Sequence, residues 1–200
     1  VLNTDELIFQ SFRYTFKQFL PEYTLSEEEL LSFLGPPLRE SFARYLSGHQ
    51  VDEAVQVYRA YNREKHNDYV TLYPHETEVL KKLHEEGIKM AIVTTKYKDA
   101  AVYGLKCADL DQYFDVVIGS DEVTHGKPHP EALRVALSHL NATKGYMIGD
   151  NVTDIQAGKN AGIGTIGVTW SLKGTQLLLE EHPDYMMESY DDLYQYLERM

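Results

Sequence analysis

From Tyr73 onward, the sequence alternates short apolar runs with amphipathic stretches, and this pattern constrains the fold more than any other feature. The apolar runs predict strands, and the stretches between them have helical periodicity. The predicted strands are 89–94, 116–119, 145–148, 165–168 and 185–187. The predicted helices are 76–86, 98–107, 130–139, 153–161 and 191–199. Strands that are apolar throughout and alternate with helices indicate a parallel sheet covered on both faces, so the fold class is α/β with a doubly wound parallel sheet.

The residues before Tyr73 predict helices only. A first helix, with Leu7 on its apolar face, ends before Pro21. Ser26 and Glu29 have the spacing of a capping box that starts a second helix over 27–33. Two more helices are expected over 38–46 and 51–66. We therefore expect a small α-helical domain over residues 5–70, with residues 1–4 and 71–200 forming the α/β core.

Composition and charge exclude several classes of function. The net charge of −12 argues against nucleic acid and anionic membranes as partners. No apolar run approaches the ~18 residues of a membrane-spanning helix, and the first residues lack the pattern of a signal peptide. Cys107 is the only cysteine, which excludes an intramolecular disulfide and is expected to be a core thiol. These features indicate a cytoplasmic protein.

Polar residues follow the predicted strands at their carboxyl ends. Thr94 and Thr95 end the first strand, and Asp150 and Asp154 follow the third. Lys127 lies between Gly and Pro, just before a predicted helix. Because the carboxyl ends of parallel strands meet at one edge of a sheet, we expect these groups to converge. Hydroxyls and an ammonium group can hold phosphoryl oxygens, and carboxylates can hold Mg²⁺, so the set predicts phosphoryl-transfer chemistry.

These residues also carry a family resemblance. Thr94 after an apolar strand, Gly-Lys-Pro at 126–128 and Gly-Asp-x-x-x-Asp at 149–154 resemble, in order and spacing, the second, third and fourth motifs of the haloacid dehalogenase superfamily. The helical first part resembles that superfamily's α-helical cap. The resemblance implies a Mg²⁺-dependent phosphatase in which Thr94, Thr95 and Lys127 bind phosphate. It implies further that Asp150 binds the metal and that Asp154 binds the metal or pairs with Lys127. It also implies an aspartyl-phosphate intermediate that water hydrolyses.

The first motif of the superfamily is absent from the sequence. In relatives, an Asp-x-Asp loop at the end of the first strand supplies the nucleophile and the general acid, and it runs into a segment like residues 1–6 of this chain. The family topology implies that this strand lies between the strands at 89–94 and 145–148. Its loss would leave two apolar strand edges open, which is unfavourable. We therefore expect the strand, with its nucleophile, to precede Val1 in the protein.

The substrate remains open at this stage. Residues 2–8 and 33–38 most resemble the pyrophosphatase subgroup, with phosphoglycolate phosphatases close behind. Arg39, in the turn of the helical part, is a candidate for binding the far end of a substrate. The alternatives are a β-phosphoglucomutase-type phosphotransferase, a dehalogenase, or a non-catalytic module that binds phosphate and metal without a nucleophile. The sequence does not determine the oligomeric state.

Two further sequence patterns, a histidine pair and a glycine repeat, are not expected to have a role in function. His125 and His129 flank Lys127 and are expected to be exposed loop residues rather than ligands. Residues 162–167 match the glycine spacing of a dinucleotide-binding loop, but that motif needs a strand before it and a helix after it. Here a helix precedes the glycines and a strand follows, so the match is accidental.

Overall fold

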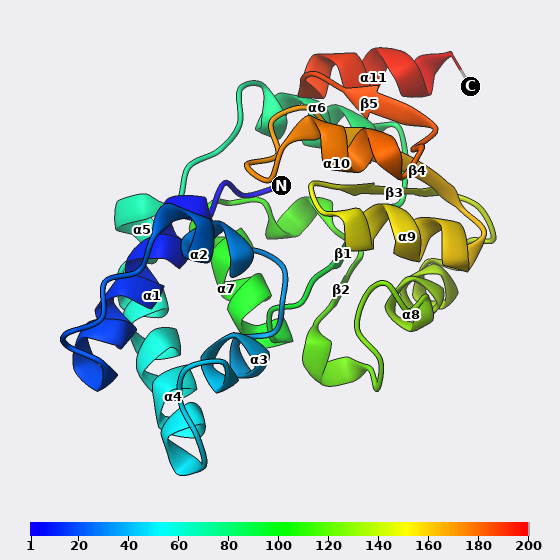
Figure 1. The fold of residues 1–200 in the computed structure, drawn as a ribbon. Helices are drawn as coiled ribbons and strands as arrows, with labels where there is room; N and C mark the ends of the chain where they lie inside the picture. The colour runs from blue at the N-terminus through cyan, green and yellow to red at the C-terminus, as the bar shows by residue number, and fades with distance from the viewer. Residues whose placement is uncertain (200) are drawn as a thin grey trace. The chain divides into compact units, whose positions relative to one another are not determined.

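The computed structural model describes residues 1–199, which form two compact units, residues 1–72 and the residues from 73 onward. The first unit is helical (Figure 1). Its helices are α1 (Asp5–Phe19), α2 (Glu27–Ser32), α3 (Leu38–Ala43), α4 (His49–Glu64) and α5 (His66–Tyr69). Near its two ends, Asn3 and Thr71 form an antiparallel bridge. This bridge closes the unit on itself.

Aromatic side chains fill the core of the helical unit. Phe12 of α1 has no exposed surface and stacks on Phe33 at a centroid distance of 4.1 Å. Phe42 of α3 and Tyr58 of α4 contact the same ring. One ring thus joins α1, α3 and α4, and rings of this size supply most of the apolar area that a small unit can bury.

The start of α2 is held by the predicted capping box. Ser26 Oγ accepts a hydrogen bond from Glu29 N, and the Glu29 carboxylate accepts one from Ser26 N. The same carboxylate accepts hydrogen bonds from the hydroxyls of Tyr23 and Tyr45. The donors, Tyr23 above all, lower the pKa of Glu29 to about 2. The charged form of this side chain therefore ties α2 to the loop after α3.

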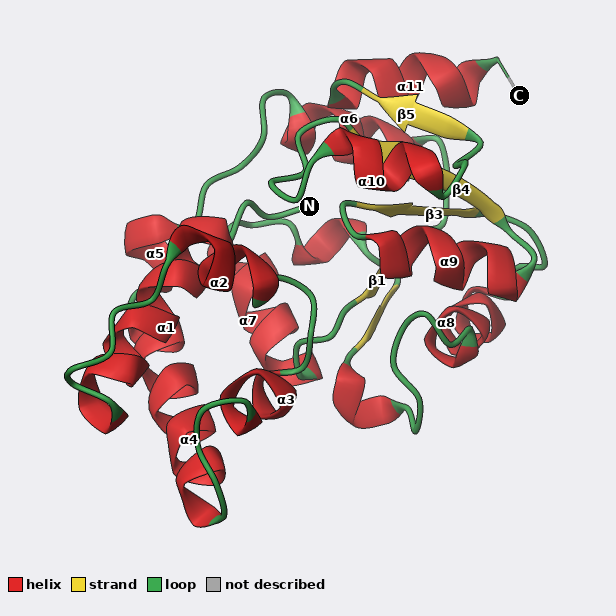
Figure 2. Cartoon of the chain, in the orientation of Figure 1, coloured by secondary structure: helices red, strands yellow, loops and turns green. Residues whose placement is uncertain are grey.

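The second unit has the alternating order that the sequence predicts (Figure 2). Its strands are β1 (Ala91–Val93), β2 (Val116–Ile118), β3 (Tyr146–Gly149), β4 (Gly164–Val168) and β5 (Tyr185–Met187). Its helices are α6 (Glu76–Glu85), α7 (Lys98–Cys107), α8 (Glu131–Leu140), α9 (Val152–Ala161), α10 (Thr175–Glu180) and α11 (Tyr190–Glu198). The 3₁₀ turns are η1 (Asp111–Tyr113) and η2 (Ser120–Glu122). Every strand pair is parallel, which confirms the predicted α/β fold class.

The strands form two separate sheets. β1 pairs with β2, and β3, β4 and β5 pair in that order, but no ladder joins β1 to β3. Both sheets nevertheless pack on the same helix layer: α8 contacts β1 and β2, and it lies against α9, which covers β3 and β4. Val93 of β1 contacts the cluster formed by Leu133, Met147 and Ala157. The two sheets therefore belong to one layer that is interrupted between β1 and β3.

Apolar strand residues beside this interruption are partly exposed to solvent. Ile148, in the middle of β3, is 38% exposed, and all three residues of β1 are only partly buried. Strands in the middle of a doubly wound sheet are normally buried on both faces. The position of the interruption is the one at which the family topology implies a further strand.

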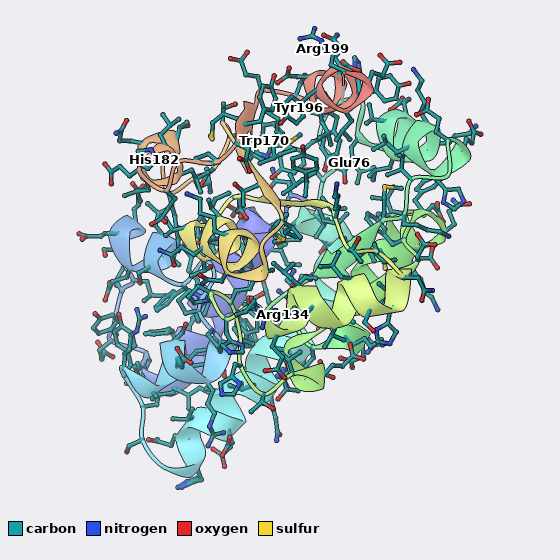
Figure 3. All side chains as sticks on the ribbon, turned by 90° about the vertical axis from the view of Figure 1, so that its right-hand side faces the viewer. Glu76, Arg134, Trp170, His182, Tyr196 and Arg199 are labelled. Atoms are coloured by element: carbon teal, nitrogen blue, oxygen red, sulfur yellow. The ribbon has the colours of Figure 1, made fainter. Side chains whose placement is uncertain are left out.

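A buried carboxylate lies at the start of α6 (Figure 3). Glu76 has no exposed surface, its Oε2 accepts a hydrogen bond from Tyr73 N at 3.0 Å, and its Oε1 has no partner within residues 1–199. Burial raises the pKa of Glu76. Tyr73 and Tyr190 both pack against the ring of Trp170, at centroid distances of 5.2 and 6.2 Å.

The structure corrects several local predictions. Cys107 is exposed on the last turn of α7, so its assignment as a core thiol was wrong. The short helices α5 and α10 were not predicted. The strand predicted over 89–94 is shorter in the structure and covers only Ala91–Val93. No helix in the described chain is long and apolar enough to cross a membrane.

Candidate functional site

Lys127 joins the carboxyl ends of the two sheets. Its Nζ donates a hydrogen bond to the carbonyl oxygen of Val93, the last residue of β1, at 3.1 Å. The same atom lies 2.6 Å from Oδ1 of Asp154, which belongs to the helix after β3. The two side chains are only 11% and 6% exposed. Lys127 therefore reaches across the interruption between β1 and β3, with its charge matched by one carboxylate.

Asp154 is fixed on the first turn of α9. Its Oδ2 accepts a hydrogen bond from Asn151 N at 3.0 Å, so both carboxylate oxygens have partners. Gly149 has to be a glycine because a Cβ at this position would overlap the Asp154 side chain. Backbone and side chain thus hold the Asp154 carboxylate in one orientation, directed at Lys127.

A carboxylate holds the loop that carries Lys127. Glu131, the first residue of α8, accepts hydrogen bonds from Thr124 N and His125 N, both at 2.9 Å. These bonds lower the pKa of Glu131, and the bond from Thr124 N has the largest effect. The Lys127–Pro128 peptide bond is cis, and the Pro128 carbonyl accepts a hydrogen bond from Asn160 Nδ2 at 3.0 Å. The loop is therefore tied to the helices at both of its ends.

Thr94 and Thr95 follow β1 and are partly buried. The Thr94 amide donates to the Ile118 carbonyl at 3.0 Å, which continues the pairing of β1 with β2. Its hydroxyl oxygen accepts a hydrogen bond from Lys96 N at 3.2 Å. Thr94 directly follows Val93, whose carbonyl binds Lys127, so the hydroxyl and the ammonium group belong to the same strand end.

Asp150, by contrast, is exposed at the end of β3. Its carboxylate has no hydrogen-bond or ion-pair partner in the described part of the chain, and it lines a cavity of about 190 Å³. Ser171 and Lys173, from the loop after β4, line the same cavity, and the Ser171 hydroxyl donates to the Asp150 carbonyl at 2.7 Å. A free carboxylate with hydroxyl and carbonyl oxygens beside it is a donor set that suits a hard cation.

Sequence reasoning did not single out Ser171 and Lys173. The signal was present, because both follow a predicted strand at its carboxyl end, as Thr94 and Asp150 do. Arg39, the candidate in the helical unit, lies on the first turn of α3 and forms an ion pair with Asp52 of α4. His125 and His129 are exposed, as expected.

Comparisons with known proteins agree with these motifs. Residues 1–168 match the model of the haloacid dehalogenase-like hydrolase family. Pyrophosphatase PpaX of Listeria monocytogenes is 45% identical over 195 residues, which cover 96% of this chain and 89% of the relative. Pyrophosphatase PpaX of Bacillus velezensis is 42% identical over the same shares of each chain.

A solved structure supports the same relationship. The haloacid dehalogenase-like hydrolase of Streptococcus pneumoniae superposes with a TM-score of 0.85 at 29% identity, covering 98% of this chain and 93% of its own. The match includes both units of the chain.

Proposed function

Because the chain belongs to the haloacid dehalogenase-like hydrolase family, we propose that it is a Mg²⁺-dependent phosphatase that hydrolyses pyrophosphate. The observation that carries this proposal is the position of Lys127. Its ammonium group bridges the ends of β1 and β3, and hydroxyl and carboxylate groups follow the same strand ends. Phosphoryl transfer relies on such positioning and charge neutralisation.

The nucleophile would come from a strand that fills the interruption between β1 and β3. In this proposal an Asp from a segment preceding Val1 ends that strand beside Lys127. Its carboxylate oxygen attacks phosphorus, the bond to the bridging oxygen breaks, and the leaving phosphate takes a proton from a neighbouring acid. Water then hydrolyses the aspartyl-phosphate, which releases the second phosphate and restores the carboxylate.

Each candidate site residue has a role in this proposal. Thr94, Thr95 and Lys127 would hold the phosphoryl oxygens, and Asp154 would orient Lys127 through the 2.6 Å contact. Asp150 would hold Mg²⁺ directly because its carboxylate is exposed and free. Asp154 would be the second carboxylate near the metal. When bound, Mg²⁺ neutralises charge on the phosphoryl oxygens. Arg39 is proposed to contact the substrate.

Pyrophosphate is favoured by the relatives and by the local charge. Both reported relatives of 42–45% identity are pyrophosphatases. In a chain with a net charge of −12, Lys96, Lys127 and Lys173 all lie in the loops that follow the strands. A small substrate with several negative charges needs cations within reach, and these three lysines are the candidates.

The test is phosphate release from pyrophosphate, phosphoglycolate and a hexose phosphate by the natural full-length protein, with Mg²⁺ or with EDTA. We expect pyrophosphate to have the highest kcat/KM, EDTA to abolish turnover, and Asp150→Asn to reduce it at least 100-fold, as for other groups that stabilise transition-state charge. Asp111→Asn, at an exposed aspartate on η1, is the matched control and should be neutral.

The outcomes separate the alternatives. Interconversion of hexose phosphates without phosphate release would indicate a phosphotransferase. Binding of phosphate and Mg²⁺ without turnover would indicate a non-catalytic module. Trapping the phosphorylated residue and locating it by peptide mass spectrometry should place it before Val1, and a phosphorylated residue within the described chain would refute the proposed nucleophile.

A further inference from the structure

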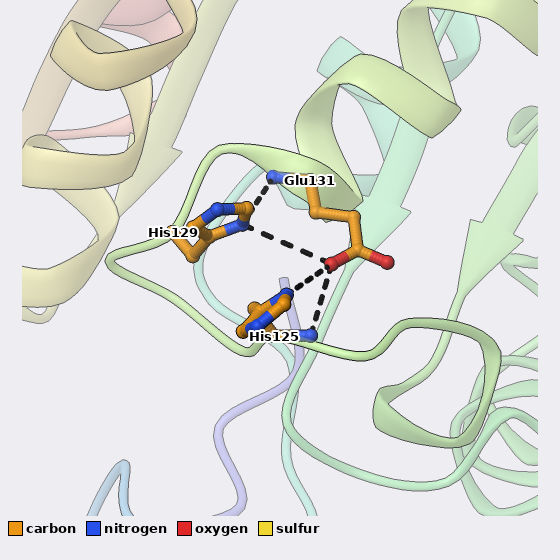
Figure 4. Close-up of side chains that lie close together, drawn as sticks. All are labelled: His125, His129 and Glu131. Carbon is orange, nitrogen blue, oxygen red and sulfur yellow. Dashed lines mark hydrogen bonds and ion pairs between the residues drawn. The ribbon is translucent and has the colours of Figure 1, made fainter.

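Three potential metal ligands converge on the loop before α8 (Figure 4). Nδ1 of His125 lies 3.0 Å from Oε2 of Glu131, and Nδ1 of His129 lies 3.8 Å from the same oxygen. One ligand atom from each residue lies within 4.8 Å of the others, and the two imidazole rings are 4.6 Å apart between centroids. These residues are not adjacent in sequence, so the loop itself brings them together.

The distances suit coordination of one ion. Zn²⁺ binds imidazole nitrogen and carboxylate oxygen at about 2.0–2.2 Å, so two ligands of a tetrahedral site lie about 3.4 Å apart. The observed separations of 3.0 and 3.8 Å lie on either side of this value. One ligand atom of each residue lies within 4.8 Å of the others, so side-chain rotations that release the imidazole nitrogens from their present hydrogen bonds would bring three ligand atoms to a single ion.

The carboxylate of the cluster is already held in place. Thr124 N donates to Oε1 of Glu131 and His125 N donates to Oε2, which fixes the position around which the two imidazoles gather. Metal-binding carboxylates are commonly oriented by hydrogen bonds of this kind. The imidazoles, at 62% and 49% side-chain exposure, remain accessible to an ion from solvent.

We propose that His125, His129 and Glu131 form a binding site for a divalent transition-metal ion of the Zn²⁺ class. Two imidazoles and one carboxylate favour Zn²⁺ over Mg²⁺, which prefers oxygen ligands only, so the site differs in selectivity from the one at Asp150. Three protein ligands leave one coordination position for water. The bound ion would link residues on both sides of Lys127 and restrain the loop that carries it.

The direct test is titration of the full-length protein, freed of any histidine tag, with Zn²⁺ by calorimetry and with Co²⁺ by visible absorption. Excess Mg²⁺ is present throughout to saturate sites made of carboxylates. We expect one equivalent to bind, with a d–d spectrum of low coordination number. His125→Ala and His129→Ala should each weaken binding at least tenfold. Glu131→Gln should also weaken it, and its single side-chain oxygen keeps an acceptor for one of the two backbone amides.

Two control variants make the test specific. His139→Ala removes another exposed histidine of the same segment, on α8, and should leave binding unchanged. Asp150→Asn should also leave it unchanged, whether or not the protein is a phosphatase. Circular dichroism verifies that each variant folds. Absence of Co²⁺ binding, or binding that survives the His125→Ala/His129→Ala double substitution, would overturn the proposal.

Discussion

Replacing Lys127 by methionine should destabilise the α/β unit more than removing any surface lysine. Methionine keeps an unbranched side chain that is one atom shorter than lysine. It leaves Asp154, which is 6% exposed, with an unmatched charge and one remaining hydrogen bond, from Asn151 N. Removing one partner of a buried ion pair costs about 3–5 kcal/mol because the other charge stays desolvated. We expect a loss in this range in urea unfolding followed by far-UV circular dichroism.

A double-mutant cycle and a surface control test the reasoning. Asp154→Asn in the Lys127→Met background removes the stranded charge and keeps an acceptor for Asn151 N, so it should recover about 1–3 kcal/mol. Lys98 contacts Glu122 at a similar distance of 2.7 Å but is 45% exposed, and Lys98→Met should cost at most about 1 kcal/mol. If Lys127→Met costs no more than Lys98→Met, or if the two changes in the cycle are additive, burial of the pair is not what makes it important.

Three further predictions follow from the described contacts. Burial raises the pKa of Glu76, so the free energy of unfolding should fall as pH rises through that raised value. Glu76→Gln should abolish this fall and raise the free energy of unfolding at pH 7 by about 1 kcal/mol. Urea unfolding at pH 5–8 measures both effects. Hydrogen bonds lower the pKa of Glu29 from its ordinary 4.5 to about 2, so its contribution to stability is complete above pH 4.5 and is lost as pH falls toward 2. Glu29→Gln should therefore reduce the loss of stability in acid, followed by circular dichroism. An unchanged loss would contradict this role of Glu29. Gly149→Ala should displace Asp154 and cost about 1–3 kcal/mol in urea unfolding, whereas Gly126→Ala, where a Cβ meets nothing within 4 Å, should be neutral.

The sequence predicted those elements whose ends are marked by local chemistry. The helix over Lys98–Cys107 and the strand over Tyr185–Met187 occur at the predicted residues. The capping box at Ser26 gave the correct start of α2. Helices of one or two turns, such as α5 and α10, carry too few residues for a periodic pattern and were missed. Cys107 was misjudged because its exposure depends on which face of α7 meets the sheet, which a short sequence window does not determine.

The candidate site was predictable to a similar degree. The sequence predicted Thr94, Lys127, Asp150 and Asp154 as site residues because they follow predicted strands, and parallel strands present their carboxyl ends at one edge of the sheet. The pairing of Lys127 with Asp154 was one of the two roles that the resemblance implied for Asp154, and the turn at Gly149 brings this carboxylate to the ammonium group. By contrast, the approach of His125 to His129 depends on how the loop folds back on Glu131.

The environment of Trp170 has a practical consequence for studying this molecule. It is the only tryptophan in the chain, and its ring neighbours Tyr73 and Tyr190 both belong to the α/β unit. The aromatic core around Phe12 contains only phenylalanine and tyrosine. Tryptophan fluorescence, excited selectively, therefore reports on one unit alone, whereas circular dichroism reports on the helices of both. Coincident unfolding curves from the two signals would mean that the units unfold together, and separated curves would assign each transition to its own unit.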